Sequence, residues 1–124
     1  MNIMSFGMVK NLIYGVEEVE IVSLDSYVQQ HNIMPTVLKI DVEGYETEVL
    51  KGAKNILKSA PKLEIEIHTE VLSRQNTSVQ EILKLIDVSR YQCWIQWDEF
   101  EAPIEFDPKQ EIPKRVHLFA IPRS

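Results

Sequence analysis

The sequence predicts an α/β fold that corresponds to one half of a doubly wound sheet, with parallel strands and a final antiparallel strand. Three observations predict it. Residues 37–42 (VLKIDV) form a β-branched, apolar run that is typical of a buried strand. Residues 43–59 carry an apolar stripe with helical spacing, and residues 63–68 (LEIEIH) alternate between polar and apolar, as a second strand does. A strand, a helix and a strand in this order predict a right-handed crossover between parallel strands.

Two shorter elements are predicted before this unit. Residues 19–24 (VEIVSL) have the composition of a short strand. Residues 25–30 are typical of a short helix, for which Ser23 and Asp25 are suitable N-cap residues, and Pro35 stops this helix.

Two glycines mark the segment between the predicted parallel strands. Gly44 follows Glu43 where strand turns into helix, which indicates either a tight turn or a close approach of the backbone to a ligand. Gly52 falls in the middle of the predicted helix at residues 43–59, where glycine costs ~1 kcal/mol relative to alanine. It either allows close packing on the sheet or marks a break in the helix.

The C-terminal half predicts one more helix and two more strands. Ser78 and Glu81 form a capping box at the start of a helix over residues 78–87, and residues 91–97 (YQCWIQW) read as a strand. Three prolines make residues 98–114 a loop, which is our candidate for part of an acceptor pocket. Residues 115–121 (RVHLFAI) form the final strand; without an intervening helix, it is expected to be antiparallel to its predecessor and to close one edge of the sheet.

Composition and charge exclude several classes of protein. The 124 residues suffice for one domain, and 13 Lys and Arg against 19 Asp and Glu give a net charge of −6. We expect no nucleic-acid or membrane partner, because an acidic chain repels phosphate and no apolar run reaches the ~18 residues that span a bilayer. The start of the chain lacks the features of a secretory signal, so a cytoplasmic location is expected. The single cysteine, Cys93, excludes an internal disulfide and is interpreted as a packing residue.

Polar residues gather where the two predicted parallel strands end. The first strand runs out into Asp41 and Glu43, and the second runs out into His68, with Glu66 two positions earlier. Ligands of open α/β sheets bind beyond these strand ends. Alternation places one set of ionisable residues on a single face of both strands, namely Lys39, Asp41, Glu64, Glu66 and His68. They are candidates for a functional site; the alternative is a structural ion pair in which Lys39 neutralises a glutamate of the second strand.

Four motifs follow one another at fixed spacing over residues 23–68. They are Ser23-Leu24-Asp25, then residues 37–46 (VLKIDVEGYE), then residues 49–53 (VLKGA), and finally residues 64–68 (EIEIH). Together they resemble the C-terminal half of the FkbM family of S-adenosylmethionine-dependent methyltransferases. The resemblance is close over these residues and loose from Thr69 onwards.

The resemblance implies a partial Rossmann-like class I methyltransferase fold and O-methylation of a hydroxyl of a sugar, a polyketide or a similar metabolite. The cofactor that it implies is S-adenosylmethionine. Asp41 and Glu43 would face the donor's methyl group and the acceptor, as catalytic and cofactor-binding residues. His68 would act as a general base, and Glu66 and His68 would bind the substrate. A base suits this reaction because a hydroxyl must lose its proton as its oxygen attacks the methyl group.

The family's glycine-rich donor-binding turn has no counterpart in the sequence. The four glycines are Gly7, Gly15, Gly44 and Gly52, and none lies in a strand-GxGxG-helix context. We therefore expect residues 1–124 to form a single partial domain that lacks the N-terminal donor-binding half and is inactive alone. The strand at residues 37–42 then becomes a sheet edge, which favours self-association or the binding of a complementing chain.

Two other functions remain open at this point. One is a non-catalytic fragment or interaction module that docks a partner chain along the exposed edge. The other is a metal-dependent hydrolase that uses Asp41, Glu43 and His68. An oxygen-rich metal site at Asp41, Glu43, Glu66 and His68 is disfavoured, because no HxH or DxD spacing supports it, and no metal is expected. His117, in an apolar strand, is interpreted as a satisfied histidine.

Overall fold

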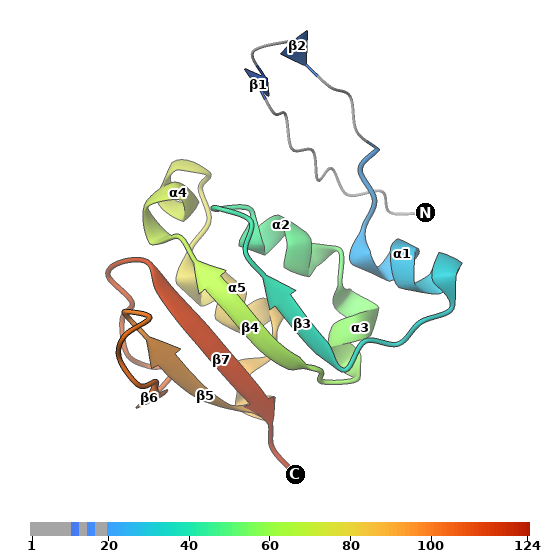
Figure 1. Ribbon diagram of the computed structural model, residues 1–124. Coiled ribbons are helices and arrows are strands. Elements are labelled where there is room, and N and C mark those ends of the chain that lie inside the picture. Colours follow the sequence, from blue (N-terminus) through green and yellow to red (C-terminus); the bar gives the residue numbers. More distant parts are fainter. Residues whose placement is uncertain (1–10, 13–14, 17–19) are drawn as a thin grey trace.

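The computed structural model describes residues 11–12, 15–16 and 20–124. Its main feature is a five-stranded sheet with the strand order β3-β4-β7-β5-β6 (Figure 1). The strands of this sheet are β3 (Val37–Ile40), β4 (Lys62–Ile67), β5 (Tyr91–Gln96), β6 (Ile104–Phe106) and β7 (Val116–Pro122). Two short strands, β1 (Asn11–Leu12) and β2 (Gly15–Val16), pair with each other as an antiparallel ribbon.

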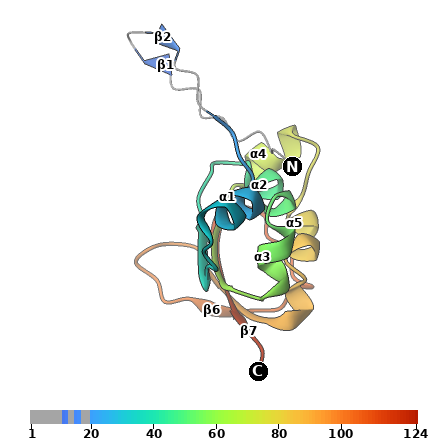
Figure 2. The same ribbon diagram turned by 90° about the vertical axis from the view of Figure 1, so that its right-hand side faces the viewer.

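The described helices lie on one side of the sheet or beside its β3 edge (Figure 1, Figure 2). They are α1 (Leu24–His31), α2 (Glu46–Lys51), α3 (Lys54–Lys58), α4 (Thr69–Arg74) and α5 (Val79–Leu85), with a 3₁₀ helix η1 at Val88–Arg90. Figure 2 shows the sheet nearly edge-on, with α2, α3 and α5 together on one side. In the part of the chain that the structure describes, no helix covers the opposite face. None of the described helices is long and apolar enough to cross a membrane.

The sheet topology confirms the parallel pair and corrects the position of the last strand. β3 and β4 are parallel, and β7 is antiparallel to β5, as the sequence predicts. However, β7 does not close an edge, because it lies between β4 and β5 and is antiparallel to both. Its inward residues Val116, Leu118 and Ala120 are at most 1% exposed. A central position buries these side chains between two neighbouring strands, which an edge would not do.

Two local predictions also need correction, and one helix was missed. Residues 20–23 are not part of a strand, since they have no regular structure and α1 starts at Leu24; residue 19 lies outside the described residues. The loop at residues 98–114 contains the short strand β6, which pairs antiparallel with β5. Helix α4, directly after β4, was not predicted. Both missed elements are short, with three and six residues, so periodicity gives little indication of them.

The predicted helix at residues 43–59 is two helices, and Gly52 marks the break. The helix α2 ends at Lys51, Gly52 and Ala53 form the turn, and α3 begins at Lys54. The start is also later than predicted. Glu43 (φ 49°) and Gly44 (φ 104°) have left-handed backbone conformations, which are incompatible with a helix. Helix α2 therefore starts at Glu46.

The Ser-Leu-Asp motif caps two helices. The Ser23 hydroxyl accepts a hydrogen bond of 3.1 Å from the backbone N–H of Ser26, which caps α1. The Asp25 carboxylate accepts hydrogen bonds from the backbone N–H groups of Asn55 (2.9 Å) and Ile56 (3.0 Å) in the first turn of α3. Asp25 thus caps a helix that is distant in sequence and holds α1 against α3.

The core lies between the helices and the covered face of the sheet. Leu38, Ile40, Leu63, Ile65 and Ile67 point into it, which confirms the alternation predicted for both parallel strands. Cys93 is 3% exposed, and burial raises the pKa of its thiol, which confirms its interpretation as a packing residue.

The outer edge of β3 is unpaired within the described residues, as the sequence predicts for residues 37–42. A hollow of about 220 Å³ runs beside this edge. Its lining is mostly apolar and consists of Val22, Ser23, Leu24, Leu38, Lys39, Ile40, Val42 and Val49. Val37, at the start of the strand, is 57% exposed.

Candidate functional site

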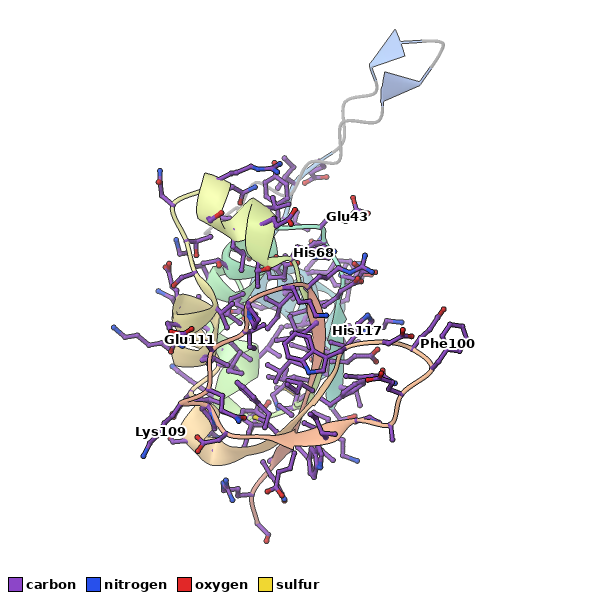
Figure 3. All side chains as sticks on the ribbon, turned by 90° about the vertical axis from the view of Figure 1, so that its left-hand side faces the viewer. Glu43, His68, Phe100, Lys109, Glu111 and His117 are labelled. Carbon is purple, nitrogen blue, oxygen red and sulfur yellow. The ribbon has the colours of Figure 1, made fainter. Side chains whose placement is uncertain are left out.

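Three predicted site residues meet where the parallel strands end. Asp41 follows β3, while Glu66 and His68 lie at the end of β4. Because β3 and β4 run in the same direction, their carboxyl ends lie side by side, and each of the three residues offers a polar atom within 4.8 Å of the others. Glu43 does not belong to this group. It lies at the same end of the sheet, where its side chain is exposed (Figure 3).

His68 is held by a buried carboxylate that the sequence analysis did not assign to the site. Its Nδ1 atom lies 2.6 Å from Oε1 of Glu46, and the Glu46 side chain has no exposed surface. A carboxylate beside Nδ1 assigns the proton to that nitrogen and leaves Nε2 as the free acceptor. The Nε2 atom faces Glu66, with a distance of 3.6 Å to Oε1.

The turn at Gly44 brings the Glu46 carboxylate into contact with the His68 ring. The Gly44 N–H donates a hydrogen bond of 3.1 Å to the same Glu46 Oε1 atom. A Cβ at Gly44 would overlap the side chain of Val71 in α4, and the positive φ disfavours any other residue. Of the two interpretations of Gly44, these observations support the tight turn.

Glu66 is surrounded by basic groups and by one other carboxylate. Its Oε1 lies 3.5 Å from Nε of Arg115 and 3.7 Å from Nε2 of His117. Burial raises the pKa of Glu66, the nearby Asp41 raises it further through a hydrogen bond and its charge, and the two histidines lower it. The pKa remains above its ordinary value, so the site disfavours the charged form of Glu66.

His117 lies in β7, the predicted final strand, and its ring faces Glu66 on the polar side of the sheet. Its side chain is 39% exposed and lies opposite Glu66 in the register of β4 and β7. It therefore extends the polar face rather than the core. The predicted structural ion pair does form on that face, with 4.0 Å between Lys39 Nζ and Glu64 Oε1.

Two hollows of about 500 Å³ each adjoin these residues. One is lined by His68, Thr69, Glu70, Val71, Trp97, Lys114 and Arg115. The other is lined by Glu66, Trp97, Asp98, Glu99, Phe100, Arg115 and His117. Both include residues from the segment 98–114, so this loop borders the candidate site; its role in acceptor binding remains a prediction.

Comparisons with known proteins define the class of this chain. The model of the Methyltransferase FkbM domain matches residues 8–93, and the chain therefore belongs to the FkbM methyltransferase domain family. This confirms the resemblance of the motifs, and the mixed α/β architecture with a five-stranded sheet is compatible with a methyltransferase-like fold.

One curated relative matches part of the chain in sequence. The chain is 38% identical over 72 residues to the hexuronic acid methyltransferase AglP of Haloferax volcanii. This match covers 57% of the chain and 30% of the relative, so the chain matches less than a third of that protein's length. No solved structure gives a significant match.

Proposed function

We propose that the chain is part of an S-adenosylmethionine-dependent O-methyltransferase that methylates a hydroxyl of a sugar or similar metabolite. The central observation is the pair of Glu46 and His68, which turns the free Nε2 nitrogen toward the carboxylates at the strand ends. Family membership supports methyl transfer, and similarity to a hexuronic acid methyltransferase supports a sugar acceptor.

The residues at the strand ends fit one part of the donor. S-Adenosylmethionine carries a positive sulfonium and, when bound, supplies an electrophilic methyl group. Asp41 and Glu43 are exposed carboxylates directly after β3, and such groups attract a cation. We assign these two residues to the donor side of the site. A glycine-rich turn for the rest of the donor is not found in the sequence.

His68 serves as the general base of the proposed reaction. Its side chain is 13% exposed and lines a hollow that is open to an acceptor. The acceptor hydroxyl would give its proton to Nε2 as its oxygen bonds to the methyl carbon, while the bond from that carbon to the donor sulfur breaks and S-adenosylhomocysteine leaves. The buried Glu46 carboxylate orients the ring and stabilises the imidazolium that forms. Glu66 lies beside Nε2, where it can hold the acceptor by a hydrogen bond.

Within residues 20–124, β3 has a free edge and one face of the sheet is uncovered (Figure 2), and both features support a partial domain. An unpaired edge presents backbone groups that can pair with another strand, and the apolar hollow beside it can receive side chains. We propose that the donor-binding half docks along this edge, from a complementing chain or from further sequence. In its absence, self-association is expected. Sedimentation that shows only a compact monomer with a cooperative melt would contradict this expectation.

Calorimetric titration with S-adenosylmethionine tests the proposed function. We expect no measurable binding by the chain alone, and binding when a fragment that carries a glycine-rich half of the family is added. Micromolar binding by the chain alone would contradict the partial site. If the fragment docks and the mixture does not bind the donor, the chain is an interaction module and the methyltransferase proposal is wrong.

A metal-dependent hydrolase is the second candidate, and one observation favours it. Asp41, Glu66 and His68 bring oxygen and nitrogen donors within 4.8 Å of one another, a set that suits a divalent cation. Glu43, which the sequence-based hypothesis included, lies outside this set. Metal analysis of the purified chain decides between the candidates, since a stoichiometric divalent metal would favour the hydrolase.

A further inference from the structure

The hollow next to His68 has a basic wall, although the chain as a whole is acidic. Lys114 and Arg115 line it from the segment that leads into β7, and Glu70 is the one acidic residue among the described residues that line it. The net charge of the chain is −6, so two adjacent cations beside the proposed base are not explained by composition. They point to a ligand that carries a negative charge.

These two cations have unused binding capacity among the described residues. Lys114 forms no salt bridge there, and its ammonium lies over the Trp97 ring, 5.4 Å from the ring centroid, as in a cation–π contact. Arg115 approaches Glu66 through Nε, at 3.5 Å, and 69% of its side chain is exposed, so its guanidinium is accessible to a ligand. A free guanidinium edge matches the two oxygens of a carboxylate.

Trp97 gives the same hollow a flat apolar surface. The ring is partly buried and lies between the two hollows, with the basic residues beside it. Such a surface suits the apolar C–H face of a sugar ring, while the charged groups reach its substituents. The hollow is about 500 Å³, which is ample for one sugar ring.

We infer that Lys114 and Arg115 bind the carboxylate of an acidic sugar, which stacks on Trp97 and presents a hydroxyl to His68. This inference rests on the proposed function and adds the charge of the acceptor and the residues that recognise it. The acceptor class is thus a sugar acid rather than a neutral sugar or a polyketide.

Titration of the chain with D-glucuronate and with D-glucose tests this inference. The two sugars differ only at C6, which is a carboxylate in glucuronate and a hydroxymethyl group in glucose. We expect glucuronate to bind at least about tenfold more tightly, with an affinity that falls as salt is added. Arg115→Gln and Lys114→Gln should each remove most of this preference. Lys109→Gln is the matched control, because Lys109 is an exposed lysine at a distance from His68 (Figure 3).

Equal affinity for the two sugars, or no binding of glucuronate, would overturn the inference. A preference for glucuronate that survives in both variants would also overturn it, and circular dichroism checks that the variants are folded. Tighter binding of glucose 6-phosphate than of glucuronate would assign a phosphate instead of a carboxylate. If the complemented protein methylates glucose and glucuronate alike, the inference is wrong and the proposed function stands. If it binds glucuronate selectively but transfers no methyl group, only the proposed function is contradicted.

Discussion

The Nδ1 atom of His68 lies 2.6 Å from Oε1 of Glu46, although the two residues are 22 positions apart and belong to different elements. The Glu46 side chain is fully buried, and its second oxygen has no hydrogen-bond partner among the described residues. A buried carboxylate is costly unless it is paired, so His68 and the Gly44 N–H stabilise Glu46 as much as Glu46 orients His68.

Replacement of Glu46 by alanine should destabilise the fold. It leaves the buried N–H groups of His68 and Gly44 without their acceptor, and each unsatisfied group costs about 1–3 kcal/mol. The exposed Glu48 in the same helix is the control, because its pairing with Lys51 at 3.5 Å is worth at most about 1 kcal/mol. Urea denaturation measures both variants. Equal stability of Glu46→Ala and Glu48→Ala would show that the buried pair has no structural role.

Replacement of Gly44 by alanine tests the turn between β3 and α2. The positive φ of 104° strains an alanine by about 1–3 kcal/mol, and the new Cβ overlaps Val71 in addition. We expect Val71→Ala to relieve only the overlap, so the double variant should recover part of the stability that Gly44→Ala loses. A Gly44→Ala protein as stable as the wild type would contradict the described turn.

Asp25→Ala tests whether the Ser-Leu-Asp motif joins α1 to α3. The substitution removes the acceptor for the N–H groups of Asn55 and Ile56, and loss of such a cap costs about 1–2 kcal/mol. Glu111→Ala, an acidic residue on the exposed surface, should change the free energy of unfolding by less than about 0.5 kcal/mol. A similar free energy of unfolding for the two variants would argue against a capping role of Asp25.

Glu66→Gln should stabilise the protein at neutral pH. Because the pKa of Glu66 is raised above 4.5 in the folded state, its contribution to stability is complete below that pH and is lost as pH rises through the folded pKa. Glutamine resembles the protonated form, so the variant should be more stable at pH 7 and similar to the wild type at pH 4. Denaturation at both pH values measures the free energy of unfolding of the variant and the wild type. A chelator is present because a metal ion bound at Asp41, Glu66 and His68 would alter the comparison. A variant less stable than the wild type at pH 7 would contradict the raised pKa of Glu66, because the charged carboxylate would then stabilise the fold.

The sequence predicted the parallel pair well because alternation is a local property. It placed Leu38 and Ile40 in the core and Glu64 and Glu66 on the polar face without knowledge of any tertiary contact. It also predicted that Asp41 and His68 meet, because parallel strands end at the same edge. The position of β7 could not be predicted, since the long loop before it allows several neighbours and only burial decides among them.

The missed site residues depend on that same tertiary arrangement. Arg115 and His117 reach Glu66 only because β7 inserts beside β4; their spacing of two did indicate a common face. An acidic residue near a helix start is ordinarily explained by the helix dipole, so Glu46 does not stand out in the sequence. Its burial follows from the left-handed turn at Glu43 and Gly44, which residue types alone do not specify. Its position in the motif at residues 37–46 was the one indication that the sequence offered.

The role of His68 as a base is measured by methyl transfer from labelled S-adenosylmethionine to D-glucuronate, with the chain complemented by a donor-binding half. We predict transfer that falls at least about 100-fold in His68→Ala and strongly in Asp41→Asn, with Glu48→Ala unaffected. Transfer at the wild-type rate by His68→Ala would contradict the account, because the imidazole at the end of β4 would then have no part in the reaction.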